Sequence, residues 1–230
     1  MPDFVLYGAP LSPFVRKVQA VLHHTRAEYD FEEIDIASMP DWFLEISPAR
    51  RIPVLRDKTV GTHGIAGTIA DSSSICVFLD RRFNAGLFGD DPFHAGRFAL
   101  FEEYADTVLA VTGGMKLFRP IMFPLFAGKE PDLDTAKKTW NEKLPKLLDY
   151  LETSLNGKSF FVGDRYSLAD IAVGAQMAFI DLVAGLPDAD RWPSLAKHTM
   201  TMKTQPGFVE NLAACQGKLS GYLKSKYDLS

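Results

Sequence analysis

The sequence predicts a two-part fold, a small α/β domain followed by an all-α domain. Apolar strands alternate with helices over the first eighty-odd residues, and a turn-rich stretch with Asn, Gly and Pro then interrupts this pattern. Long amphipathic helices without a convincing strand fill the remainder. We therefore expect a first domain over 1–84, a linker over 85–91 and a helical domain over 92–230. A chain of 230 residues is long enough for two such units.

The first domain begins with a predicted βαβ unit. An apolar strand over 4–7 leads into a Gly-Ala-Pro turn, and Ser12 and Pro13 are typical N-cap and first-turn residues of a helix that extends to about His24. A second strand is expected over 28–36. These two strands should be parallel, with a right-handed crossover through the helix.

The remainder of this domain is predicted to complete the order βαβαββα. A short helix over 41–46 precedes a third strand that starts at Ile52 and Pro53. A polar, glycine-containing loop over 58–67 leads to a short strand over 68–70, and Asp71 then caps another helix.

The second domain should contain two long amphipathic helices around 98–112 and 136–155, the second kinked by Pro145. Ser167 and Asp170 have the spacing of a capping box, with Asp in place of Glu. The helix that they start is almost wholly apolar and should therefore be central and buried. Shorter helices are expected after Pro193 and Pro206.

Composition argues against several classes of partner. The net charge is −4, so neither nucleic acid nor an anionic membrane is an expected partner. No apolar run approaches the roughly 18 residues of a membrane span, and no signal peptide is visible, so we expect a cytoplasmic protein. Cys76 and Cys215 are expected to be reduced thiols. The histidines fit no metal-binding spacing, so no metal is expected.

Ser12 is the first candidate functional residue. As an N-cap it lies beside unpaired backbone N–H groups and the positive end of a helix dipole, which suits a phosphate, carboxylate or thiolate. A Ser-Pro pair can equally do no more than cap its helix. These residues alone leave both interpretations open.

Four motifs decide between them. They are Ser-Pro-Phe-Val-Arg-Lys-Val at 12–18, Ser-Pro-Ala-Arg-Arg-Ile-Pro-Val-Leu at 47–55, Asp-Ser-Ser-Ser-Ile at 71–75 and Gly-Asp-Arg-Tyr-Ser-Leu-Ala-Asp-Ile at 163–171. In this order and spacing, the chain resembles the cytosolic glutathione S-transferase superfamily over nearly its whole length. The resemblance implies a thioredoxin-like first domain that binds glutathione and a helical bundle that forms the electrophile pocket. It departs from the family pattern at Ser47, where Asn is usual, and at Asp71, where Glu is usual.

The resemblance implies a catalytic role for Ser12, whose hydroxyl would donate a hydrogen bond to the glutathione thiolate. The rival is Tyr7 at the end of the first strand, because a Tyr has this role in other classes of the family. Tyr7 can also be a plain core aromatic. We favour Ser12, because the motif around it matches the serine-type classes closely.

The remaining glutathione contacts are also implied by the resemblance. Pro53 should follow a cis peptide bond, with the Ile52 backbone pairing with the cysteinyl part of glutathione. Asp71 and Ser72 should hold its γ-glutamyl end. Arg51 either binds the glycine carboxylate or is a solvated loop charge.

A second set of residues could form the wall of the electrophile pocket, although aromatic and methionine side chains at helical spacing are more often core. The set comprises Leu11, Tyr104, Val108, Met115, Phe118 and Arg119.

The leading functional interpretation is a glutathione transferase for small hydrophobic electrophiles, with possible peroxidase side activity. One alternative is a specialised glutathione-dependent lyase, dehalogenase or ether-cleaving enzyme, and another is a non-catalytic binding protein of the same fold. Glutathione would be a co-substrate. The family suggests a homodimer, and the loop over 58–67, longer than is usual, could cover the glutathione site or enter the dimer interface.

Overall fold

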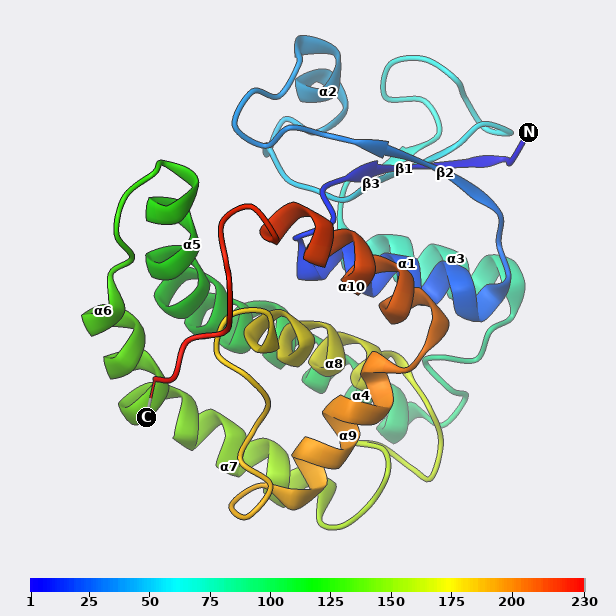
Figure 1. The fold of residues 1–230 in the computed structure, drawn as a ribbon. Coiled ribbons are helices and arrows are strands. Elements are labelled where there is room, and N and C mark those ends of the chain that lie inside the picture. Colours follow the sequence, from blue (N-terminus) through cyan, green and yellow to red (C-terminus); the bar gives the residue numbers. More distant parts are fainter. Residues whose placement is uncertain (230) are drawn as a thin grey trace.

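The computed structural model describes residues 1–229 and contains a four-stranded sheet above a bundle of helices (Figure 1). The strand order is β2-β1-β3-β4. β1 (Phe4–Gly8) pairs in parallel with β2 (Tyr29–Glu33), and β3 (Val54–Asp57) runs antiparallel to both β1 and β4 (Thr68–Ile69). The predicted parallel βαβ unit is confirmed. β2 is shorter than the predicted 28–36 because its pairing with β1 ends where Ile34 N donates to Gly8 O.

Helices cover both faces of the sheet. α1 (Pro13–Thr25) and α3 (Ser72–Phe83) lie on the face toward the bundle, whereas α2 (Asp41–Ile46) covers the opposite face (Figure 1). The alternation of side chains along β1 sends Leu6 toward α1 and Tyr7 toward α2. The predicted order of elements in the first domain is confirmed.

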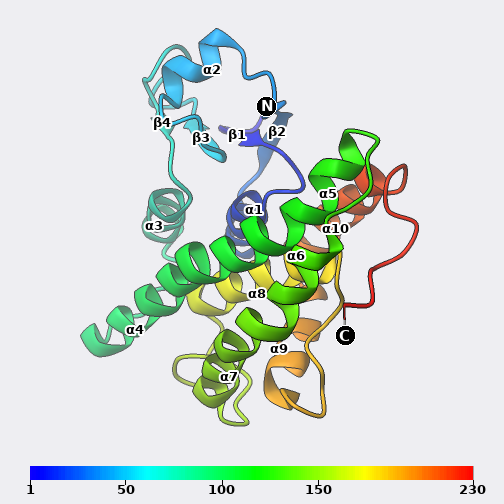
Figure 2. The same ribbon diagram turned by 90° about the vertical axis from the view of Figure 1, so that its left-hand side faces the viewer.

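The bundle begins with one continuous helix made of α4 (Pro92–Glu103), the π-helical η1 (Tyr104–Phe118) and α5 (Arg119–Phe126), which is seen along its length in Figure 2. A second long helix consists of α6 (Leu133–Lys138), the π-helical η2 (Thr139–Lys143) and α7 (Leu144–Leu155). Pro145 lies in the first turn of α7, directly after η2. Both long helices were predicted, but their π-helical stretches have no signal in the sequence.

α8 (Leu168–Asp181) is the centre of the bundle, and all 14 of its residues are buried. It contacts α1, α4, η1 and α9 (Pro193–Lys203), while α10 (Pro206–Leu219) packs on α1. The prediction of a central, buried helix is confirmed. Cys76 and Cys215 are buried free thiols, as expected.

The helix Pro92–Phe126 is long and apolar enough to cross a membrane by length and composition. It is not an uninterrupted apolar run, because charged residues such as Glu102, Lys116 and Arg119 lie within it. Core helices of globular proteins meet the same criterion, and this one carries Phe101 and Leu109 into the bundle core.

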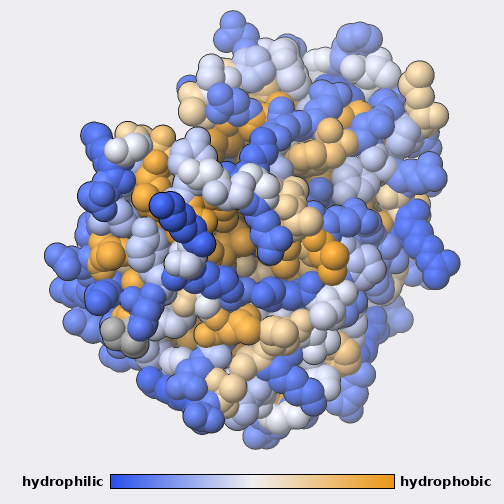
Figure 3. Space-filling model, in the orientation of Figure 1, coloured by the Kyte–Doolittle hydropathy of each residue, from blue (hydrophilic) through white to orange (hydrophobic). Residues whose placement is uncertain are grey.

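On the face shown in Figure 3, apolar surface forms separate patches broken by hydrophilic residues.

Candidate functional site

Ser12 caps α1 with part of its hydrogen-bonding capacity unused. Its Oγ accepts from Val15 N at 3.4 Å, a long contact, and its backbone is anchored by Ser12 N donating to Ala9 O at 3.0 Å. Among residues 1–229, no group accepts a hydrogen bond from the Ser12 hydroxyl. The half-buried hydroxyl can therefore donate to a ligand at the start of α1.

Tyr7 lies on the other side of the sheet. Its buried ring packs edge-on against Trp42 and Phe43 of α2, with centroid separations of 5.4 and 6.4 Å. Tyr7 therefore packs in the layer between the sheet and α2, whereas Ser12 begins α1, which lies on the opposite face of the sheet (Figure 1).

Sheet topology brings the other predicted contacts to the edge where Ser12 lies. Tyr7 at the end of β1 pairs with Val54 at the start of β3, and Leu55 pairs with Ile69 at the end of β4. β3 is antiparallel to both of its neighbours, β1 and β4. The end of β1, the start of β3 and the end of β4 therefore lie at the same edge of the sheet. At this edge the chain leaves β1 toward Ser12, enters β3 from Pro53 and leaves β4 toward Asp71.

The loop before β3 has the backbone geometry that the resemblance implies. The Ile52–Pro53 peptide bond is cis. Ser47 takes part in holding the loop, since its Oγ donates to Arg51 O at 2.8 Å and accepts from Arg51 N at 3.2 Å. Arg51 is exposed, and among the described residues its guanidinium has no ion-pair partner.

Asp71 uses one carboxylate oxygen to cap α3. Oδ1 accepts from Ser74 N at 2.8 Å and from Ser74 Oγ at 2.9 Å. Desolvation by itself raises the pKa of Asp71, but the Ser74 hydrogen bonds and the charge of Lys17 lower it below its ordinary value. An ionised carboxylate thus lies at the surface next to Ser72, which is buried.

Two buried cations flank this site, and the sequence interpretation assigned neither of them a role. Arg16 donates to Asn211 Oδ1 at 2.6 Å, to Ala175 O at 2.9 Å and to Cys215 Sγ at 3.3 Å, which ties α1 to α10 and α8. Burial lowers its pKa. Lys17 contacts Glu102 and Asp106 in the helical domain. In the sequence they appear only as two charges within the motif at 12–18, on a helix that also carries Gln19 and two histidines.

The residues predicted for the electrophile pocket separate into two groups. Phe118 is core, stacked on Phe179 at 4.2 Å, and the half-buried Tyr104 donates to Leu147 O at 3.4 Å within the bundle. The other four lie nearer the surface. Leu11 is half-buried against the bundle core, Val108 and Met115 are exposed on η1, and Arg119 lies over the Phe123 ring.

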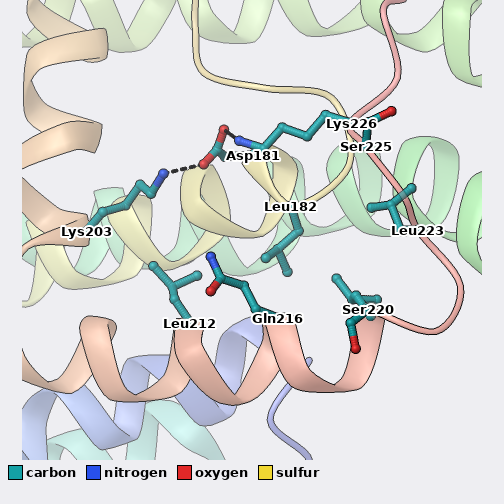
Figure 4. A pocket seen from close by; sticks show the side chains of 10 residues that line it. Asp181, Leu182, Lys203, Leu212, Gln216, Ser220, Leu223, Ser225 and Lys226 are labelled. Atoms are coloured by element: carbon teal, nitrogen blue, oxygen red, sulfur yellow. Dashed lines mark hydrogen bonds and ion pairs between the residues drawn. The ribbon is translucent and has the colours of Figure 1, made fainter.

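A cavity of about 320 Å³ lies elsewhere, between α8, α10 and the C-terminal segment (Figure 4). Leu182 and Leu212 contribute to its apolar lining, while Asp181 is held between Lys203 and Lys226. None of the predicted site residues lines it. Within the described part of the chain, no cluster of three or more His, Cys, Asp or Glu could hold a metal ion.

Known proteins with the same architecture were found by sequence and by structure. Models of the glutathione S-transferase N-terminal and C-terminal domains match residues 6–86 and 116–214. Glutathione S-transferase D6 of Drosophila melanogaster is 27% identical over 222 residues, covering 92% of this chain and 93% of the relative. A probable glutathione S-transferase of Glycine max is 25% identical over 234 residues, covering 98% and 95%.

A solved structure of glutathione S-transferase-I bound with the ligand lactoylglutathione superimposes with a TM-score of 0.79 at 19% identity. The match covers 93% of this chain and 100% of that chain, and supports the same fold. With both domain models matched in order across most of its length, the chain belongs to the cytosolic glutathione S-transferase superfamily.

Proposed function

We propose that this chain is a glutathione transferase in which Ser12 activates the glutathione thiol for attack on small hydrophobic electrophiles. The observation that carries the proposal is the meeting of Ser12, Pro53 and Asp71-Ser72 at one edge of the sheet. In this proposal glutathione binds to residues 1–84, residues 85–91 are the linker, and the electrophile binds against residues 92–230.

The available interactions are strong enough for this chemistry. A cysteine thiol with a pKa near 8.5 is only about 3% thiolate at pH 7, and lowering that pKa by about two units takes roughly 2.7 kcal/mol. A hydrogen bond from Ser12 to the charged sulfur would supply about 1.5–3 kcal/mol, and the α1 dipole roughly 0.3–1 kcal/mol more. No general base is required.

The remaining contacts follow glutathione along the edge of the sheet. The Ile52 backbone beside cis-Pro53 would pair with the cysteinyl unit, while Asp71 would accept from the γ-glutamyl ammonium through Oδ2, the oxygen not used in capping. Ser72 would contact the γ-glutamyl carboxylate, and the exposed Arg51 the glycine carboxylate.

For the electrophile we propose a wall made by the half-buried Leu11 and the exposed Val108 and Met115. Arg119 would lie at its far end. Tyr104 and Phe118 would support this wall from the core side.

We also propose a homodimer. Exposed apolar side chains occur on the loop before β4, on α3 and on α4, which lie along one side of the molecule in Figure 2. They include Val60, Ile65, Val77 and Phe93. Light scattering on the full chain tests the mass, and a monomer at micromolar concentration would contradict the dimer.

The activity itself is tested by conjugation of a chloronitroaromatic with glutathione. We expect turnover by the wild type, a fall of about 10–100-fold in Ser12→Ala and little change in Tyr7→Phe, because the Ser12 hydroxyl has no acceptor among the described residues whereas the Tyr7 ring packs on the α2 face of the sheet. Full activity in Ser12→Ala would remove its role, and a collapse in Tyr7→Phe would transfer that role to Tyr7. No glutathione binding by calorimetry would favour a non-catalytic binding protein.

A further inference from the structure

The strongest feature outside the proposed thiol site is the buried ammonium of Lys17. Its side chain is 1% exposed, and it lies in α1 between the thiol end of the site and the helical domain. Its Nζ donates to Glu102 Oε1 at 2.7 Å, to Asp106 Oδ2, and to Ser73 Oγ at 3.3 Å. Burial alone lowers the pKa of Lys17, but Cys76, Asp106 and Glu102 together raise it above its ordinary value.

These contacts join four elements, α1, α3, α4 and η1, at one point. Lys17 belongs to α1, more than one turn beyond Ser12, and Ser73 belongs to the first turn of α3, beside Ser72. Glu102 is in α4 and Asp106 in η1, so the two carboxylates lie on either side of the junction where the α-helix becomes π-helical. The π-helical winding changes the positions of side chains around the helix axis.

Ser73 closes the network from the α3 side. Its Oγ accepts from Lys17 and lies 3.5 Å from Asp106 Oδ2, to which it donates. The first turn of α3 is therefore bonded directly to the helical domain, independently of the sheet that carries it. Buried ion pairs are often no more stabilising than apolar residues of the same size, so stability alone gives no strong reason for three ionisable groups here.

We propose that Lys17, held by Glu102 and Asp106 of the helical domain, is a positioning residue that fixes the first turn of α3 for the γ-glutamyl end of glutathione. The proposal rests on the proposed function. Lys17 acts through Ser73 and does not touch the thiol. Its loss should weaken glutathione binding, whereas loss of Ser12 should slow the chemical step.

Asp106 makes this network sensitive to pH. Burial raises its pKa to about 6, although Lys17 lowers it. The charged and titratable groups that act on this network are Lys17 of α1, Glu102 and Glu103 of α4, and Asp71 and Cys76 of the α3 segment. Ionised Asp106 accepts from both Lys17 and Ser73, and protonation removes the charge from both contacts. Glutathione should thus bind less tightly below this pKa.

The test uses calorimetry with reduced glutathione and steady-state conjugation on the full chain. The central variant, Lys17→Met/Glu102→Gln/Asp106→Asn, removes every charge of the network while keeping side-chain size, so no buried charge is left unpaired. We expect its Kd for glutathione to rise about tenfold and kcat at saturating glutathione to stay within about twofold. Ser12→Ala should lower kcat and leave the Kd for glutathione nearly unchanged. Lys17→Arg keeps the charge at this position and should bind glutathione more tightly than the triple variant does.

Two further variants keep the test decisive if the triple variant does not fold. Ser73→Ala removes only the hydroxyl between Lys17 and Asp106 and should raise Kd severalfold. Lys58→Met removes a surface ion pair of the same domain, with Asp30, and should leave Kd unchanged. An unchanged Kd in folded Ser73→Ala, or in the folded triple variant, overturns the inference.

The pH profile adds a readout that a purely structural ion pair would not alter. Between pH 7.5 and 5.5 the wild-type Kd should rise up to about fourfold, because Asp106 becomes protonated over this range, whereas Asp106→Asn should show no such rise. Equal pH profiles would contradict the role of Asp106. Failure of the wild type to bind glutathione at any pH would instead refute the proposed function.

Discussion

Two serine-capped helices in this molecule, α1 and α8, begin in very different surroundings. Ser12 at the start of α1 is half-buried, its contact with Val15 N is long, and its hydroxyl proton is free for a ligand. Ser167 at the start of α8 is fully buried and donates its Oγ to Asp170 Oδ2 at 2.7 Å and its N to the same oxygen at 2.9 Å. We call the Ser167 cap, whose hydroxyl is fully engaged, the closed cap, and the Ser12 cap, whose hydroxyl proton is free, the open cap. The closed cap stabilises the core, and the open cap leaves a hydrogen-bond donor for a ligand.

The closed cap extends beyond α8. Asp170 Oδ1 also accepts from Phe161 N at 3.0 Å and lies 3.2 Å from His198 Nε2, so one buried carboxylate joins α8, the segment before it and α9. Both oxygens of the Asp170 carboxylate therefore have hydrogen-bond partners within the described part of the chain.

The largest effect is expected for Asp170→Ala. It leaves the buried donors of Ser167, Phe161 and His198 without their acceptor and should lower the unfolding free energy by about 3–5 kcal/mol. Urea unfolding measures the change. Asp91→Ala, which removes an exposed cap of α4, is the matched control and should cost about 1 kcal/mol. Equal losses in the two variants would show that burial of the α8 cap contributes nothing.

The second effect is a pH dependence of stability near α1. The pKa of Asp106 is about 6 in the folded chain, above its unfolded value, so the folded state binds more protons between about pH 4 and 6. The unfolding free energy of wild type minus that of Asp106→Asn should therefore increase as pH falls through this window, by up to roughly 3 kcal/mol. Urea unfolding at several pH values measures it. A difference that decreases toward low pH would contradict the raised pKa.

The third prediction concerns the open cap. Ser12→Ala should lower kcat by about 10–100-fold, because it removes a charge-assisted hydrogen bond of about 1.5–3 kcal/mol. Its unfolding free energy should change by less than about 1 kcal/mol, since the capping contact is long. Conjugation kinetics and urea unfolding on the same protein give both values. A large stability loss with unchanged kcat would make Ser12 an ordinary cap.

The smallest effect is expected for Ser167→Ala. Asp170 would still accept from the backbone N of residue 167, from Phe161 and from His198, so the loss should be about 1–2 kcal/mol in unfolding free energy. Activity per folded molecule should not change. A fall in kcat comparable with that of Ser12→Ala would mean that the two caps are coupled.

Much of the fold could be predicted because its signals are local. Short-range capping signals predict the helix starts at Ser12-Pro13, Asp71 and Ser167. Each of these three helices is confirmed. The π-helical stretches in the two long helices, by contrast, have no local signal. The preference for Ser12 over Tyr7 came from the motif around Ser12, and the placement of Tyr7 against α2 became visible only in the tertiary structure.

The sequence by itself determined the order of strands and helices in the first domain, the capped starts of α1, α3 and α8 and, through four short motifs, the family. Only the tertiary structure decided which charges are buried and which distant residues meet. Arg16 and Lys17 are ordinary helix residues in the sequence, and they become buried because α8, α10 and the α4–η1 junction close over α1. The proposed glutathione site is assembled because β3 runs antiparallel to both of its neighbours. Such placements depend on long-range packing, which capping and periodicity do not encode.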